Sequence, residues 1–164
     1  MTKYYTGVGA RATPIDVCKR MTKLATQLEE QGWILRSGHA DGSDMAFEDG
    51  VEDPLNKEIY IPWKGFNGSD SKLYPASDEA FRIAWKIHKH WNDLTPGARK
   101  LHARNIHQVL GKDLKTPSKF LICWTLGGKD VGGTRTAIIL ARQNNIPVYN
   151  LFSDIENNTI LFGK

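Results

Sequence analysis

Cysteine and long apolar runs are scarce in this 164-residue sequence. The two cysteines, Cys18 and Cys123, have no second cysteine or histidine at metal-ligand spacing, so we expect reduced core thiols and neither metal nor cofactor. No segment approaches the roughly 20 apolar residues that span a bilayer, and the first residues lead into a strand pattern rather than a secretory signal. These absences predict a cytoplasmic protein with no membrane partner.

A strong excess of one charge is also missing. Lysine and arginine number 22 against 18 aspartates and glutamates, which gives a formal net charge of +4. This moderate basicity favours anionic partners, but the dense cationic stripe of a dedicated DNA-binding protein is lacking. Apolar residues make up 40% of the chain, as in folded proteins. We therefore expect one domain over residues 1–164.

Strand patterns alternate with helix patterns along the chain. Short apolar runs at residues 3–8, 33–37, 58–61, 120–124 and 147–151 are typical of strands. Helix-start signals lie between them at Thr13-Pro14, Ser77 and Thr95-Pro96. Such alternation predicts an α/β fold, with a doubly wound, mainly parallel sheet of about five strands and helices on both faces.

Glycine-rich loops follow three of the predicted strands, at residues 7–9, 38–42 and 132–133. Each loop alone is more typical of a tight turn, but the carboxyl ends of parallel strands lie at one edge, where ligands bind. Free backbone N–H groups and helix N-termini there can bind phosphate. Arg11 and Arg135 flank the first and last loops and are candidates to clamp that phosphate.

Asp44 and Glu48 are four residues apart and therefore share a helix face beside the second loop. Two neighbouring carboxylates can raise one pKa and create an acid, a base or a nucleophile. The alternative interpretation is that Asp44 caps the helix or binds a loop amide, while Glu48 contacts solvent or an arginine. His39 lies in the same loop and is a secondary candidate for a site residue, because a histidine can titrate near neutral pH. Trp63 and Phe66 are candidates for base stacking or for core packing.

The order of these motifs resembles the DNA-processing protein A (Smf) family and its wider superfamily with the Lonely Guy phosphoribohydrolases (SLOG). The resemblance covers nearly the whole chain and implies a Rossmann-like fold, a ligand pocket at one sheet edge and recurrent self-association. The residues that carry it, and that it implies as ligand-binding together with Arg11 and Asp44, are Gly7, Gly9, Ser37, Gly38, Asp41, Gly42, Arg104, Asn105, Gly132, Gly133, Thr134 and Arg135. The Lonely Guy enzymes place a catalytic glutamate two residues after a glycine-threonine pair, where this sequence has Thr136.

Three functions follow, in this order of preference. The first is a module that binds a nucleotide or nucleotide-derived ligand, with arginines on phosphate and Asp44 on a ribose hydroxyl. The second is an N-glycosidase acting on a nucleoside monophosphate, with Asp44 or Glu48 as the catalytic carboxylate. The third is single-stranded DNA binding. We also expect a homo-oligomer, because Phe81, Trp85 and Trp91 add aromatic surface to what the resemblance implies.

Overall fold

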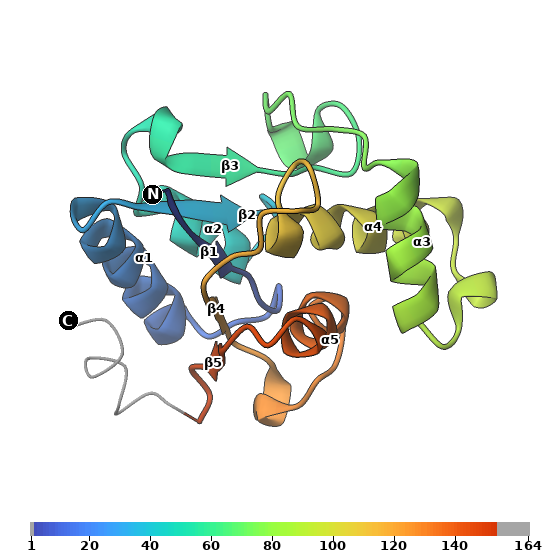
Figure 1. Cartoon of the computed structure of the whole chain (residues 1–164). Helices are drawn as coiled ribbons and strands as arrows, with labels where there is room; N and C mark the ends of the chain where they lie inside the picture. The colour runs from blue at the N-terminus through green and yellow to red at the C-terminus, as the bar shows by residue number, and fades with distance from the viewer. Residues whose placement is uncertain (1, 154–164) are drawn as a thin grey trace.

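Five parallel strands form one sheet in the order β3-β2-β1-β4-β5 in the computed structural model (Figure 1), which describes residues 2–153. The strands are β1 (Lys3–Gly7), β2 (Trp33–Ser37), β3 (Lys57–Ile59), β4 (Leu121–Cys123) and β5 (Val148–Asn150). This order confirms the predicted Rossmann-like, doubly wound sheet. Met1 and residues 154–164, which the predicted domain of residues 1–164 includes, lie outside the described residues.

The order in which strands are added to the sheet reverses at β1. The chain builds outward from β1 to β2 and β3, then returns across the sheet to place β4 on the other side of β1. The β1–β4 pairing is short, with Thr6 opposite Leu121 and Gly7 opposite Ile122. The loops after β1 and β4 therefore diverge to opposite faces and leave a crevice between them, as expected at a topological switch point.

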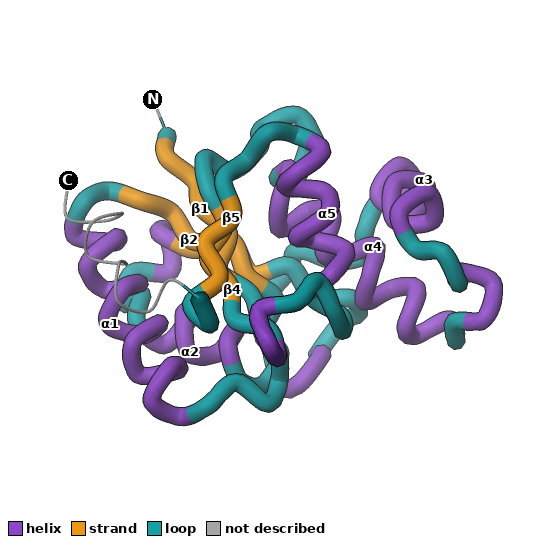
Figure 2. Tube along the Cα trace, turned by 90° about the horizontal axis from the view of Figure 1, so that it is seen from below, coloured by secondary structure: helices purple, strands orange, loops and turns teal. Residues whose placement is uncertain are grey.

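Helices cover both faces of the sheet (Figure 2). Helices α1 (Ile15–Glu30) and α2 (Ser43–Asp49) lie on one face, and α4 (Pro96–Leu110) and α5 (Arg135–Gln143) lie on the other, with α3 (Asp78–Ile87) packed outside α4. The hydroxyls of Ser77 and Thr95 cap α3 and α4 as predicted. The Thr13 hydroxyl instead donates to Ala10 O at 2.6 Å, so it stabilises the loop after β1 and does not cap α1.

Two apolar clusters fill the space between the layers. Tyr5, Leu35 and Ile122 form one cluster with the buried side of α1, which includes Met21 and Leu28. On the other face the cluster contains parts of β4 and the buried sides of α4 and α5. Strand β4 is fully buried, as expected for a strand covered on both faces. Within residues 2–153, every helix is too short or too polar to cross a membrane.

An isoleucine pair tests this core. Ile138 of α5 is 0% exposed, whereas Ile15 at the start of α1 is 75% exposed. We expect Ile138→Ala to lower the free energy of unfolding by about 2 to 5 kcal/mol, because the substitution leaves a cavity. Ile15→Ala is the matched control and should change it by less than about 0.5 kcal/mol. Urea unfolding measures both, and equal losses would contradict the layering.

Candidate functional site

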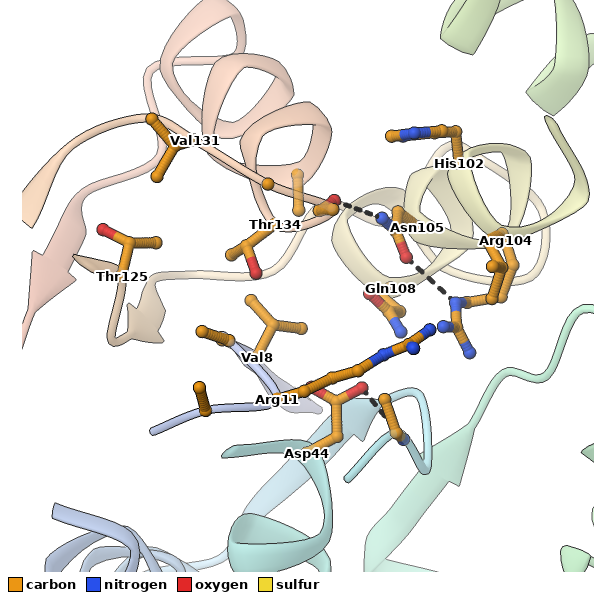
Figure 3. Close-up of a pocket in the computed structure, with 18 of the residues that line it drawn as sticks. Val8, Arg11, Asp44, His102, Arg104, Asn105, Gln108, Thr125, Val131 and Thr134 are labelled. Atoms are coloured by element: carbon orange, nitrogen blue, oxygen red, sulfur yellow. Dashed lines mark hydrogen bonds between the residues drawn. The ribbon is translucent and has the colours of Figure 1, made fainter. Parts of the chain in front are cut away.

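A pocket of about 470 Å³ lies over the switch point. Its walls come from the loop after β1, the loop after β2 with the start of α2, the loop after β4 with the start of α5, and one side of α4. Figure 3 shows side chains from these walls pointing into a common space between the loops and α4. The pocket therefore occupies the carboxyl edge of the sheet, where the glycine loops predicted a ligand.

Gly9 allows the loop after β1 to pass between the start of α2 and the loop after β4. A Cβ atom at this position would lie 2.2 Å from Ser43 Oγ and 2.9 Å from the carbonyl oxygen of Trp124. The next amide, that of Ala10, donates to the same Trp124 oxygen at 3.0 Å. The close approach requires glycine here because any side chain would push the loops apart.

Arg104 joins three walls of the pocket from its place on α4. Its guanidinium is 5% exposed and donates to Gly38 O at 2.6 Å and to Tyr60 O at 2.9 Å. The Nε atom donates to Asn105 Oδ1 at 2.9 Å, and Asn105 Nδ2 donates to Gly133 O at 2.9 Å. The Arg104-Asn105 pair thus connects the loops after β2 and β3 to the loop before α5.

Two guanidinium groups share the pocket. Burial lowers the pKa of Arg104 to about 10; the Asp44 carboxylate opposes this shift, and the Arg11 charge adds to it. Arg11 extends across the pocket toward Arg104 (Figure 3). Like charges facing each other in a partly desolvated space repel. An anion bound between them would remove this repulsion.

Asp44 is the acidic group of the pocket lining that the structure describes. The side chain is 4% exposed, and its Oδ2 accepts a hydrogen bond from Ala40 N at 3.3 Å. Burial raises the pKa of Asp44 to about 6, although the Arg104 charge and the Ala40 amide oppose the shift. The carboxyl therefore changes charge close to neutral pH.

Glu48 lies one helical turn from Asp44 and has a different environment. Its Oε1 is 2.8 Å from His39 Nδ1, an ion pair when the imidazole is protonated. The other His39 ring nitrogen lies 3.2 Å from Asn67 O, and Asn67 Nδ2 donates to Asp41 Oδ1 at 3.1 Å. Glu48 and His39 thus fasten the loop after β2 to residues 66–68, and neither lines the pocket.

The pocket contains part of the predicted set of site residues. Those that line it are Gly9, Arg11, Asp44, Arg104, Asn105, Gly132, Gly133 and Thr134. Those outside the lining are Gly7, Ser37, Gly38, Asp41, Gly42, Glu48 and Arg135. Several of the second group support the first: Ser37 Oγ donates to Gly7 O at 2.6 Å, and Gly38 O accepts from Arg104.

Phe66 and Trp63 stand beside Arg104 and outside the pocket lining. The Arg104 Cζ atom lies 5.3 Å from the centre of the Phe66 ring. Trp63 meets Phe66 edge to face, with ring centres 5.5 Å apart. Both aromatic residues therefore help to position the buried guanidinium.

Sequence reasoning missed two pocket residues on α4, His102 and Gln108. Burial lowers the pKa of His102 to about 4, with further lowering by His88, and its Nδ1 lies 2.8 Å from Thr136 Oγ1. Gln108 is 1% exposed, and its Nε2 has no hydrogen-bond partner among the described residues. The available signal was the three-residue spacing of His102, Asn105 and Gln108, which places polar groups along one side of a packed helix.

The chemistry of the lining favours a polar anionic ligand. Among residues 2–153 there is no group of three or more His, Cys, Asp or Glu side chains that could hold a metal ion. Two guanidiniums, a carboxyl and a neutral imidazole line the pocket instead. Together with the backbone at the start of α5, they can bind phosphate and hydroxyl groups.

Sheet order and pocket position together define a Rossmann-like α/β protein with a pocket at the switch point. Among solved structures, the chain is similar to DNA processing protein A from Helicobacter pylori, described for its single-stranded DNA binding mode. The two share 19% identity with a TM-score of 0.56 over 90% of this chain and 63% of that one. This likeness shows the fold, and the chain spans less than two thirds of its neighbour.

No protein-family model matches the sequence, and no curated protein matches it.

The raised pKa of Asp44 predicts a pH-dependent stability. The folded state keeps the Asp44 proton up to about pH 6, whereas the unfolded chain loses it near 3.8, so this group reduces stability as pH rises between those values. We expect Asp44→Asn to gain about 2 kcal/mol of unfolding free energy relative to wild type between pH 4 and pH 7, by the linkage relation. Chemical denaturation across this range measures the difference.

His102 has the opposite effect over the same range, because its lowered pKa makes stability fall as pH decreases through about 6.5 to 4. This contribution is present in both proteins and cancels in the difference between them. Asp49→Asn, at an exposed carboxylate on the same helix, is the matched control. The same pH dependence in both variants would show that burial of Asp44 is not its cause.

Proposed function

We propose that the protein binds a nucleotide in this pocket and recognises the nucleotide phosphate between Arg11 and Arg104. The observation that carries the proposal is the convergence of two guanidinium groups on one pocket, one of them 5% exposed. Arginine presents two parallel donors that match phosphate oxygens, and such charge-assisted bonds are stronger than neutral ones. A phosphate between the two side chains would offset the cost of burying Arg104.

The start of α5 supports the same ligand. Gly132, Gly133 and Thr134 line the pocket directly before the helix, where free amides and the helix dipole favour an anion. A Cβ atom built on Gly133 meets nothing within 4 Å, so open space lies where a ligand would approach the backbone. Asp44 is then available to the sugar or the base.

The nucleotide can be free or part of a single strand. A free nucleotide or nucleotide-derived molecule needs only the pocket. Single-stranded DNA is supported by the similarity to DNA processing protein A, whose description names that ligand. Both forms share phosphate recognition, but only a strand gives affinity that grows with length and falls steeply with salt.

Homo-oligomer formation belongs to the same proposal, because the resemblance to the Smf family implies self-association. A cytoplasmic location and the absence of a cofactor remain predictions from the sequence.

Removing the Arg11 charge should weaken phosphate binding. We expect Arg11→Gln to reduce affinity for a nucleoside monophosphate by about 10-fold to 100-fold, the cost of one charged hydrogen bond. Affinity for the corresponding nucleoside should not change, because the nucleoside has no phosphate. Isothermal titration calorimetry measures both ligands, and Lys23→Gln on the exposed side of α1 is the matched charge control. Equal loss in the Arg11 and Lys23 variants would contradict the proposal.

N-glycosidase activity is the second candidate, and the environment of Asp44 favours it. A carboxyl with a pKa of about 6 in a ligand pocket suits acid-base chemistry near neutral pH. Asp44 lines the pocket, whereas Glu48 is paired with His39. If the protein cleaves nucleotides, Asp44 is therefore the better placed of the two predicted carboxylates.

A nucleotide panel tests the catalytic proposal. After incubation with each nucleoside monophosphate, chromatography measures the free base that is released. If wild type releases base, we expect Asp44→Asn to lower turnover by orders of magnitude with little loss of affinity. Glu48→Gln is the matched variant and should retain most of the turnover. No release by wild type would exclude hydrolysis of these substrates, and release that survives Asp44→Asn would place the chemistry elsewhere.

A further inference from the structure

A second hollow, of about 380 Å³, lies on the outer side of α3 and α4. We call it the α3–α4 groove; its lining includes the aromatic side chains Phe81, Trp85 and Trp91 and the cationic side chains Arg82, Arg99 and Lys100. Helix α3 stands at one end of the molecule, outside α4 and away from the sheet (Figures 1 and 2). The groove is therefore separate from the pocket at the switch point.

The aromatic surface of the groove is open to solvent. Trp85 is 54% exposed, although a side chain of this size is usually largely buried. Trp91 is half-buried and meets Phe81 edge to face, with ring centres 6.4 Å apart. An indole face is thus available on α3 beside a second indole held in place by the core.

Cations surround this surface, and no acidic residue is among the described residues that line it. Arg99 is fixed over the groove, since its Nε donates to Trp91 O at 3.1 Å and its Nη2 to Asn92 O at 3.2 Å. Arg82 has an exposed ion pair with Glu79 at 2.8 Å, an interaction that contributes little and leaves the guanidinium hydrated. The groove therefore combines stacking surfaces with positive charge.

We infer that the α3–α4 groove binds single-stranded nucleic acid as a second subsite, on the other side of α4 from the pocket; the inference rests on the nucleotide-binding function proposed above. Bases can stack on Trp85 and Trp91 while Arg82, Arg99 and Lys100 bind the phosphates, the combination by which proteins bind single strands. A second copy of the chain fits less well. In a two-fold symmetric contact these three cations would face the same three cations of the partner.

Helix α4 connects the two subsites. Ala98, Leu101 and His102 line the pocket, whereas Arg99 and Lys100 line the groove. These positions are on two sides of the same helical turns, and a helix with its side chains is only about 10 to 12 Å across. A strand that crosses the beginning of α4 can therefore occupy both sites.

Strand length separates the subsites experimentally. Fluorescence anisotropy compares labelled thymidine monophosphate, which can occupy only the pocket, with a labelled oligo-dT of twenty nucleotides, which reaches both sites. We expect wild type to bind the 20-mer more tightly than an abasic strand of the same length. Trp85→Ala should weaken 20-mer binding by about tenfold or more, because the stacking energy of one base is lost. The variant should also show a smaller difference in affinity between the 20-mer and the abasic strand.

Matched variants distinguish stacking from charge and from misfolding. Trp85→Phe keeps an aromatic face and should restore most of the 20-mer affinity. Lys100→Gln should weaken the 20-mer and the abasic strand equally, whereas Lys23→Gln on α1 should have little effect on either. None of these four substitutions should change binding of the labelled monophosphate, and circular dichroism melting checks that each variant is folded.

The results also separate this inference from the proposed pocket function. If Arg11→Gln weakens binding of the monophosphate while Trp85→Ala binds the 20-mer like wild type, the pocket function stands and the groove inference is overturned. If wild type does not bind the nucleoside monophosphate but binds the 20-mer through Trp85, the pocket function fails and the groove is supported. Light scattering that shows a wild-type dimer dissociated by Trp85→Ala would identify the groove as a contact between copies and overturn the inference.

Discussion

The buried guanidinium of Arg104 is the constraint on which the site depends. It donates to the backbone after β2 and after β3, and through Asn105 it reaches the loop before α5. An unpaired buried charge would cost several kcal/mol, as for other isolated ions. These acceptors, together with the Phe66 ring and the nearby Asp44 charge, offset that cost. The interactions that stabilise Arg104 therefore also fix the distances between the pocket walls.

Local sequence patterns were sufficient to predict the fold. Short runs rich in apolar residues marked the positions of the strands, and Ser77 and Thr95 mark the starts of α3 and α4. Parallel strands separated by helices then require a doubly wound sheet. The Thr13 hydroxyl was the exception, because a sequence signal for a cap cannot show that a nearer loop carbonyl, that of Ala10, competes for the same donor.

The site was only partly predictable. Asp44 and Glu48 share a helix face, as their spacing predicted, but one turn moves Glu48 by about 6 Å along the axis, and there His39 pairs with it. Arg135 follows the last glycine loop in sequence, yet the guanidinium that shares the pocket with Arg11 is Arg104. The family resemblance indicated Arg104 and Asn105 as site residues. The hydrophobic periodicity of the sequence could not indicate them, because the side of α4 that faces the crevice depends on how α3, α4 and the sheet pack. His102 and Gln108 were missed for the same reason.

Helix α4 contributes side chains to both the pocket and the α3–α4 groove. Its carboxyl-terminal half is buried and carries the polar residues that join the loops, so it is rigid and positions the pocket. Its amino-terminal half is more exposed and carries Arg99 and Lys100 on the side away from that pocket. Rigid elements hold ligand-binding groups more accurately than loops do, and one helix with binding groups on two sides fixes the distance between them. A ligand that spans both sides would therefore meet a preorganised surface and lose less conformational freedom in the protein than if two separate loops had to order.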